Sequence, residues 1–568
     1  MPQLLDLPPE ILVNIFLFLH FLDVGSCKRT CLRLCDVISN SSQIAYHVEL
    51  QVAGMQDNPN CKLPITVRLQ MIKDREEAWG SFKPQFTKNV QVPFESSGLY
   101  DVTPDLYLAG KNEKLGRRVT NHIQAIRLPH KKGEDPTWHS VDFASNIVDF
   151  ATSIEEDDLL AAVTMTKQEG RAPQMSIVLR RFSTQQLYDG IANPVIFICD
   201  MPQDVEGRPA ISIEIAGAHL VVIPEYMIDD DALHDQRPLM YIWNWKTGKR
   251  LADPIPVENP GLVFLREDIF LNPSMPKNSI DIYHISDDNV HLMKQLSFPS
   301  LQFERAISLI ACRGDPSPTA NGTFPKHTPQ RRPYTNCPED AIIVFAIQIG
   351  DQGDVTNDEA DHFFMIVHRR ALLSLLVSNA STSSSQEVPA EIVPWESWGP
   401  AITRWLPAES WSMNFITLSA GQRFVFLSIP SDLGDSDDGI DLLFEPLFTL
   451  LDFNPWNVKR FQGKDLSNVR HPTRTVIGVN PIPASTPVEE NHPLAELPEN
   501  ICPRLDSFAE DVVSRLPYVE YSHLDHFHYM AHTSVLIDEE RLIGLKSHSP
   551  QDLHFDQEAD SLDAMYFG

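Results

Sequence analysis

The sequence predicts an α+β multidomain protein in which a short helical segment precedes a large, mainly β region. Three observations support this fold class: the first 42 residues have helical periodicity, short β-rich runs recur after residue 97, and prolines lie between those runs. The 44 prolines are about 8% of the 568 residues, above the usual ~5%. We expect units at residues 1–42, 43–96 and 97–568, since a chain of this length favours several domains.

The first predicted helix begins near Pro8. Pro8 and Pro9 suit a first turn, where backbone amides have no helical acceptor, and Glu10 suits the positive end of the helix dipole. The apolar residues that follow repeat with a helical period on one wide face: Ile11, Leu12, Ile15, Phe16 and Leu19. Leu17 and Phe18 extend the apolar surface to the other side. The helix therefore needs cover on more than one side.

Two short helices are expected next, one capped by Asp23 and one over residues 30–38. About 40 residues rarely hold a stable core alone, so the segment should bury apolar surface against a partner or the rest of the chain. Each large apolar side chain contributes ~1.5–3 kcal/mol when fully buried. Five of them would drive tight association after the entropic cost of binding.

The pattern L-P-x-E-I-L-x-x-I-F-x-x-L over residues 7–19 resembles the opening helix of the F-box family. Residues 22–23 and the TCLRLCDVI run at 30–38 resemble its second and third helices. In that family, the Leu-Pro pair and the apolar positions after it contact the Skp adaptor, which a cullin scaffold holds. Carried over, the resemblance implies these adaptor-binding residues: Leu7, Pro8, Ile11, Leu12, Ile15 and Phe16. The aromatic often found near the end of the third helix is absent, and an ordinary N-terminal core helix is the alternative.

Residues 43–96 are expected to link the two parts through a short strand at Val48–Leu50 and a helix over 67–79. Leu69, Ile72, Ala78 and Trp79 are its expected buried members. This stretch resembles the one that follows the F-box in a large group of fungal F-box proteins. Three later strings resemble the same group: PWESWGPAITR at 394–404, AGQRFVFL at 420–427 and LDFNP at 451–455. For the string at 394–404, two roles are possible: packing in the core or an aromatic-basic recognition patch.

The β-rich runs beyond residue 97 fall into roughly seven groups with β-branched and aromatic enrichment. W-x-x-G at 245–248 resembles the end of a propeller-blade strand. A divergent β-propeller of about seven blades is predicted, because radial repetition leaves few open strand edges. A pair of β-sandwiches is the alternative. Residues 315–338 and 378–386, rich in Pro, Thr, Ser or Arg, are expected to form long flexible loops.

The net charge of −31 argues against nucleic-acid binding as the main activity and weakly favours a target with a basic surface. Eight cysteines without a CxxC pair indicate a reduced, intracellular protein, cytoplasmic or nuclear. The apolar stretch at 11–22 follows acidic residues and is too short to cross a bilayer, so no signal peptide or membrane segment is expected.

The search for catalytic chemistry finds no G-x-S-x-G, GxxxxGK[ST] or HExxH motif. Four histidines cluster near the C-terminus without metal-ligand spacing: His523, His526, His528 and His532. The acidic run at 435–438 departs from a calcium loop. We expect no catalytic residue, no metal and no cofactor.

The resulting hypothesis is a substrate receptor of an SCF-type cullin-RING ubiquitin ligase, with the Skp adaptor on the helical segment and an unknown protein target on the β region. The protein would not be an enzyme, because catalysis by proximity would come from its partners. An F-box scaffold acting outside the ligase is the alternative. An enzyme built on a propeller is a third possibility, for which no constellation is visible in the sequence.

Overall fold

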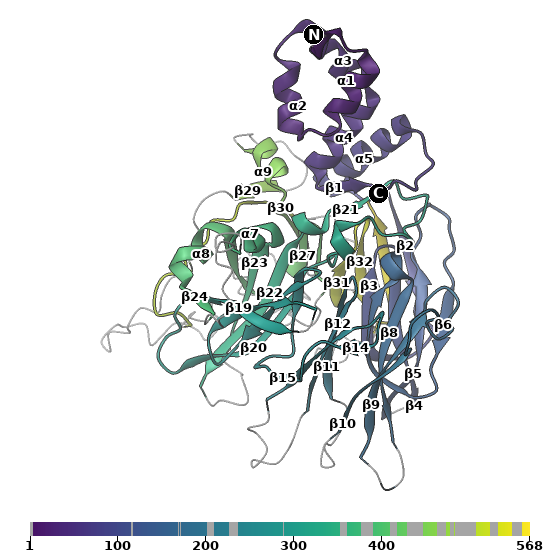
Figure 1. The fold of residues 1–568 in the computed structure, drawn as a ribbon, viewed down its shortest axis with the longest axis vertical. Helices are drawn as coiled ribbons and strands as arrows, with labels where there is room; N and C mark the ends of the chain where they lie inside the picture. The colour runs from purple at the N-terminus through teal and green to yellow at the C-terminus, as the bar shows by residue number, and fades with distance from the viewer. Residues whose placement is uncertain are drawn as a thin grey trace, which may run out of the picture.

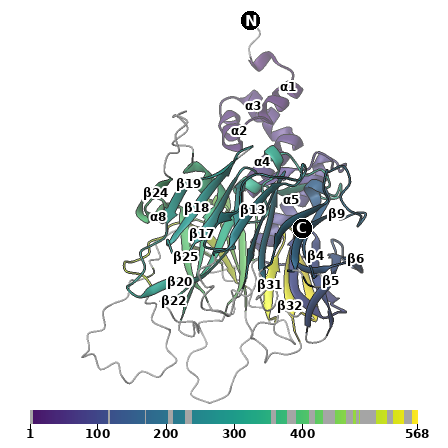
Figure 2. The ribbon, with the colours of Figure 1, turned by 60° about the horizontal axis from the view of Figure 1, so that its bottom comes forward.

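The computed structural model describes residues 4–114, 117–167, 170, 172–201, 209–226, 237–287, 289–352, 360–376, 390–408, 417–428, 447–462, 473–476, 482, 507–522, 532–547 and 559–568. A helical unit at the N-terminus stands on one end of a large β region (Figure 1). Figure 2 shows the same arrangement with the bottom of the β region turned forward. None of the described helices is long and apolar enough to cross a membrane.

The helical unit consists of a short 3-10 turn and four helices. The elements are η1 (Leu4–Asp6), α1 (Pro9–Phe16), α2 (Phe21–Lys28), α3 (Leu32–Asn40) and α4 (Ser42–Ala53). Pro8 is the N-cap of α1 and Pro9 its first residue, as predicted from their missing amide hydrogens. The cap of α2 is His20 rather than Asp23, since the His20 ring accepts from the Leu22 amide at 3.4 Å. The core of the unit contains Leu12, Phe16, Val24, Leu34, Ile38 and Ile44.

The predicted strand at Val48–Leu50 is wrong, because these residues lie inside α4. The Ser41 hydroxyl caps this helix by accepting from the Ile44 amide at 3.3 Å, and Gly54 ends it in the left-handed conformation with φ of 68°. Ile44 packs into the helical unit and Leu50 into a second cluster below it. Burial on both sides outweighs the weak strand preference of Val48.

The connection to the β region is packed rather than loose. Strand β1 (Met55–Asp57) pairs antiparallel with β21 (Tyr334–Asn336), and helix α5 (Ile65–Gly80) covers the predicted helix at 67–79. Trp79 is buried and stacks on Phe567 with ring centroids 4.0 Å apart. The linker thus belongs to the same core as the last residues of the chain.

In the described part of the β region the strands form seven larger sheets, and most of them are meanders of neighbouring strands. The first contains β3 (Ser96–Thr103), β4 (Leu106–Lys114), β5 (Arg117–Arg127) and β6 (Trp138–Asp142). The second contains β7 (Asn146–Ser153), β8 (Leu159–Thr166), β9 (Gln174–Arg181) and β10 (Val195–Asp200). The third contains β11 (Ala210–Ala216), β12 (His219–Glu225), β13 (Leu239–Asn244), β14 (Lys249–Arg250) and β15 (Ile255–Pro256).

Two of the remaining four sheets include a strand from a distant part of the chain: β24 in the fourth sheet and β2 in the seventh. The fourth contains β16 (Val263–Arg266), β17 (Ile269–Ser274), β18 (Ser279–Ile285), β19 (Val290–Ser297) and, parallel to β19, β24 (Glu391–Val393). The fifth contains β20 (Arg305–Arg313), β22 (Ile342–Asp351), β23 (Asp361–His368) and β25 (Thr403–Ala408). The sixth contains β26 (Ser419–Ala420), β27 (Arg423–Ser428), β28 (Leu447–Asp452), β29 (Thr473–Val476) and β30 (Tyr518–Ser522). The seventh contains β2 (Phe86–Gln91), β31 (Ser534–Ile537), β32 (Arg541–Lys546) and β33 (Ser561–Tyr566).

The seven sheets close into a ring. Strand β2 pairs antiparallel with β33, so the start of the β region completes its last sheet. Apolar clusters lie between each sheet and the next all the way round, the last one joining the seventh sheet to the first. This is the arrangement of a seven-bladed β-propeller, which confirms the predicted fold class, and it differs from two separate sandwiches. We call it the ring.

The aromatic corner at residues 394–404 is part of the core of the ring. Trp395 and Trp398, on helix α8 (Trp395–Ile402), are 6% and 2% exposed, and Arg404 is fully buried. The Arg404 guanidinium donates to the Leu516 carbonyl at 2.7 Å and lies 5.5 Å from the Tyr518 ring centroid. These residues therefore pack the interior, and the alternative of a surface recognition patch is wrong.

The predicted flexible loop at residues 315–338 is instead a packed segment, which we call the crossing segment. It leaves β20 and contains β21, where Tyr334 and Asn336 are buried, and Arg332 is 1% exposed. Composition does not predict this packing, because the segment is held by contacts with distant parts of the chain, such as the pairing of β21 with β1 and of Arg332 with Glu155. The second predicted loop, 378–386, lies outside the described residues.

Candidate functional site

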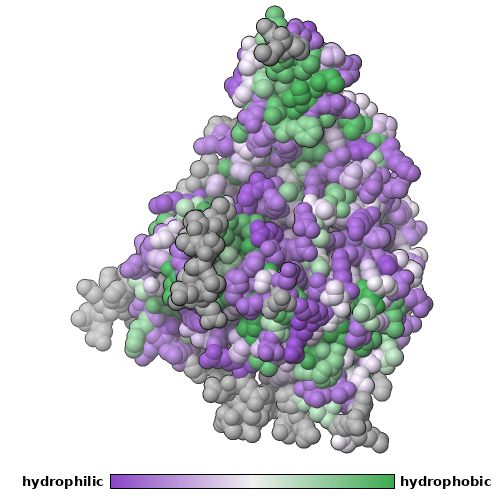
Figure 3. Space-filling model, viewed as in Figure 1, coloured by the Kyte–Doolittle hydropathy of each residue, from purple (hydrophilic) through white to green (hydrophobic). Residues whose placement is uncertain are grey.

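The helical unit carries exposed apolar side chains. Figure 3 shows an apolar patch on this unit, at the top of the molecule. The exposed residues are Leu4, Leu5, Ile11, Ile15, Phe18, Leu22 and Leu32, which we call the apolar tip. Large apolar side chains gathered on one surface of a folded unit are typical of a protein-binding surface.

The structure divides the six residues that the resemblance implied. Pro8, Ile11 and Ile15 are exposed, with Ile11 at 44% and Ile15 at 36%, and Leu7 is half-buried. Leu12 and Phe16 are 0% and 3% exposed and lie in the core of the helical unit. These two pack against residues of α2, α3 and α4, and adaptor contact by the six residues stays a prediction.

The other members of the apolar tip were not among the predicted residues. Phe18 is 90% exposed and Leu32 is 84% exposed. The exposure of Phe18 could have been predicted, because in the sequence it falls outside the main apolar face of the first helix. Leu32 carries no periodic signal, since it starts α3 and only the folded unit shows that its side chain is uncovered.

The helical unit also touches the ring directly. Phe21, the first residue of α2, meets Trp456 edge-to-face at a centroid distance of 4.6 Å. Trp456 lies on α9 (Pro455–Phe461), and Asn454, the cap of α9, donates to the Val52 carbonyl of α4 at 2.8 Å. These contacts, together with β1–β21 pairing, hold the unit in one orientation on the ring.

We expect Trp456→Ala to loosen α2 without unfolding the ring. An edge-to-face aromatic pair contributes about 0.5–1.5 kcal/mol beyond area burial, so amide hydrogen exchange in α2 should rise about two- to tenfold. Trp138→Ala is the matched control, because it removes a similar pair with Phe94 at 5.0 Å far from α2. Equal exchange in α2 for both variants would contradict a holding role for Trp456.

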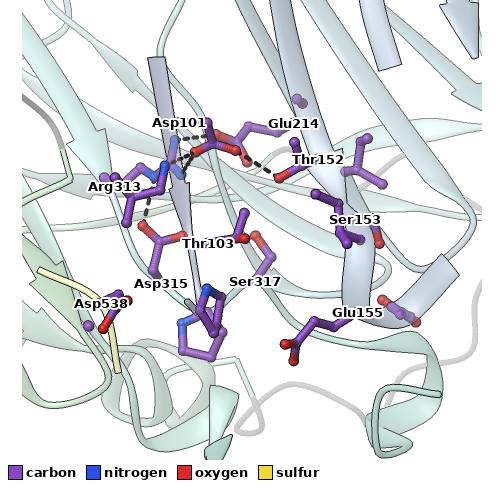
Figure 4. A pocket seen from close by; sticks show the side chains of 18 of the residues that line it. Asp101, Thr103, Thr152, Ser153, Glu155, Glu214, Arg313, Asp315, Ser317 and Asp538 are labelled. Carbon is purple, nitrogen blue, oxygen red and sulfur yellow. Dashed lines mark hydrogen bonds and ion pairs between the residues drawn. The ribbon is translucent and has the colours of Figure 1, made fainter. Parts of the chain in front are cut away.

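A cavity of about 250 Å³ lies at the centre of the ring and is partly open to solvent. The first strands of several blades line it, namely β3, β7, β11, β20, β26 and β31, together with the crossing segment. Its lining residues include one arginine, Arg313, while Arg332 and Arg541, which are not among them, pair with Glu155, Glu539 and Asp538. The lining also includes eight carboxylates: Asp101, Asp149, Glu155, Glu156, Glu214, Asp315, Asp538 and Glu539. Figure 4 shows most of these side chains around the cavity.

Arg313 pairs with three of these carboxylates at once. Its Nη2 lies 2.9 Å from Asp101 Oδ1, its Nε 2.8 Å from Asp315 Oδ2, and its Nη1 3.9 Å from Glu214 Oε1 (Figure 4). Burial raises the pKa of Glu214 to about 7; Arg313 opposes the rise, and Asp315, Asp101 and Asp149 add to it. Arg313 thus pairs closely with Asp101 and Asp315 and only loosely with Glu214.

We expect Glu214→Gln to change how stability depends on pH. The folded-state pKa of Glu214 exceeds its ordinary value of 4.5, so its contribution to stability is fully present below about pH 4.5 and is lost as pH rises through about 7. The glutamine variant should match the wild type near pH 5 and exceed it by about 1–3 kcal/mol at pH 8. Thermal unfolding from pH 5 to 8 measures this, with Glu396→Gln on the surface as control. A constant difference across this range would contradict the assignment.

Residues 4–50 match the protein-family model described as F-box-like. The helical unit is an F-box-like domain. The match spans the 3-10 turn, α1 to α3 and most of α4, and includes the apolar tip. It covers less than a tenth of the chain, so it describes this domain and not the ring. None of the curated proteins matches the chain.

Solved structures resemble the ring only weakly. A functionally unknown protein from Desulfotomaculum acetoxidans is 11% identical over 46% of this chain and 84% of its own, with a TM-score of 0.24. A luciferin-regenerating enzyme is 7% identical over 52% and 91%, with a TM-score of 0.24. The C-terminal WD40 domain of Sif2 is 12% identical over 52% and 86%, with a TM-score of 0.21. Similarity at this level assigns no function to the ring.

The predicted histidine cluster is only partly visible. His523, His526 and His528 lie outside the described residues, as does the acidic run at 435–438. His532 is described, and its Nε2 lies 3.0 Å from Asp563 Oδ2. No group of three or more His, Cys, Asp or Glu residues within the described ranges could hold a metal ion.

Proposed function

We propose that this protein is a substrate receptor of an SCF-type ubiquitin ligase, without bond chemistry of its own. The F-box-like domain binds the Skp adaptor, and through it a cullin, and the ring binds a protein target. The observation that supports this most is the apolar tip, which is exposed on a domain matching the F-box-like family model.

The geometry suits such a role, because the target must be held at a fixed place relative to the adaptor. Phe21–Trp456 packing, the Asn454–Val52 hydrogen bond and β1–β21 pairing resist rotation of the F-box-like domain. A target bound on the ring would therefore be kept in one orientation with respect to the ligase, and proximity would accelerate ubiquitin transfer.

The test compares cells carrying the wild type with cells carrying Ile11→Asp/Ile15→Asp, which charges the apolar tip. Proteins captured by both forms are identified, and their half-lives are measured. A receptor predicts at least one captured protein whose ubiquitylation and turnover require the wild-type apolar tip. Captured proteins with unchanged half-lives would favour the scaffold that acts outside the ligase.

A further inference from the structure

Glu214 lines the central cavity with only a loose charge partner. Asp101 and Asp315 accept hydrogen bonds from Arg313, whereas Glu214 lies 3.9 Å away from it and forms the weakest of the three pairs. The Glu214 side chain lines the cavity and is 23% exposed, so a ligand in the cavity can reach it. A ligand that brings a positive charge here would pair with Glu214.

A further group of the cavity wall is buried without a hydrogen-bond partner among the described residues. Asn336 is 5% exposed, and its Nδ2 group finds no acceptor. Glu539, also 5% exposed, accepts from the Asn336 amide at 2.8 Å, and its Oε2 lies 3.7 Å from Arg332 Nη1. A buried donor left unsatisfied costs free energy, so Asn336 favours a ligand that carries an acceptor.

The volume of the cavity and the spacing of its carboxylates indicate which class of molecule it could bind. The carboxylates are spread around the wall rather than grouped at metal-ligand spacing among the described residues. A cavity of about 250 Å³ that is partly open to solvent has room for one extended side chain. An organic cation on a flexible stem fits these limits better than a metal ion.

We propose that the cavity binds a basic side chain of a peptide segment, lysine or arginine, with Glu214 as its main charge partner. This inference rests on the proposed function and specifies it, because the peptide would belong to the protein target. The cation pairs with the carboxylates near Arg313. A neighbouring peptide carbonyl supplies the acceptor for Asn336.

The test measures binding of the full chain to acetyl-Gly-Ser-Arg-Ser-Gly-amide by calorimetry at pH 8, where Glu214 is ionised. The matched ligand contains citrulline in place of arginine, which keeps the shape and removes the charge. We expect binding of the arginine peptide, at least tenfold weaker binding of the citrulline peptide, and at least tenfold weaker arginine-peptide binding by Glu214→Gln. Glu396→Gln, a surface change on α8, should leave binding unchanged.

Several outcomes would overturn the inference: no binding of the arginine peptide, equal binding of citrulline, equal loss in both variants, or agmatine binding as tightly as the peptide. Retention of the Skp adaptor is measured on the same preparations. If the chain binds the adaptor but not the peptide, only this inference is contradicted. If the chain does not bind the adaptor, the proposed function is contradicted. Asp315→Asn provides a second cavity variant if Glu214→Gln fails to fold.

Discussion

The Ile11→Asp/Ile15→Asp variant is expected to bind the Skp adaptor at least 100-fold more weakly than the wild type. Both side chains are exposed on α1 and belong to the apolar tip. Binding can bury only the exposed 44% of Ile11 and 36% of Ile15, so at ~1.5–3 kcal/mol per fully buried side chain the two contribute roughly 1–2.5 kcal/mol of the roughly 2.7 kcal/mol of a 100-fold change. Burying two carboxylates in an apolar interface adds a further cost. Titration of purified adaptor against the purified chain measures the effect.

The surface position of both residues makes this test specific. The ring and the core of the F-box-like domain should keep their thermal stability, because neither side chain belongs to the core cluster of that domain. Ile392→Asp is the matched control, since Ile392 is 66% exposed on β24 of the ring. Undiminished adaptor binding by the double variant would remove the apolar tip from the interface.

Replacing Arg332 with methionine is expected to destabilise the ring by about 3–5 kcal/mol. Arg332 is 1% exposed; it pairs with Glu155 on α6 (Ile154–Asp157) and lies 3.7 Å from Glu539. Removing the cation leaves two buried carboxylates without their charge partner, which costs several kcal/mol. Denaturant unfolding at pH 8 measures the loss.

The pH dependence of this loss has a definite sign. Burial raises the pKa of Glu539 to about 7 even beside Arg332, and it raises the pKa of Glu155 as well. Without Arg332 both should rise further, so the folded state binds protons more tightly than the unfolded chain. The deficit should therefore shrink as pH falls from 8 toward 5.

Arg370→Met is the control for this prediction. Arg370 also pairs with two carboxylates, Glu339 at 3.5 Å and Asp340 at 2.7 Å, but its side chain is 59% exposed. An exposed pair contributes about 0–1 kcal/mol, so this variant should unfold almost like the wild type. Equal losses for the two arginines would show that the centre of the ring does not depend on buried charge pairing.

The helical and strand elements could be predicted because their signals are local. Pro8, Pro9 and the apolar spacing from Ile11 to Phe16 are sufficient for a first helix with one face to bury. The W-x-x-G turn at 245–248 lies between β13 and β14, and Trp245 is 1% exposed. Both features depend on residues within a few positions of one another.

The failures have a common cause, which is contact between residues far apart in the chain. Val48 lies in a helix because α4 is buried on two sides, by α1 to α3 and by α5 with β21. The crossing segment is packed because Arg332 meets Glu155 and Glu539, more than 170 positions away in each direction. Neither set of contacts can be predicted from local composition.

By itself, the sequence determined a helical N-terminal segment with a partner-binding pattern, a β-rich remainder of about seven groups and an acidic surface. The tertiary structure decided which apolar residues of α1 remain exposed, how β2 and β33 close the ring, and that Arg313 and Glu214 from different blades face one cavity. The physical reason is that periodicity reflects short-range backbone geometry, whereas burial and charge pairing depend on which distant segments are brought together.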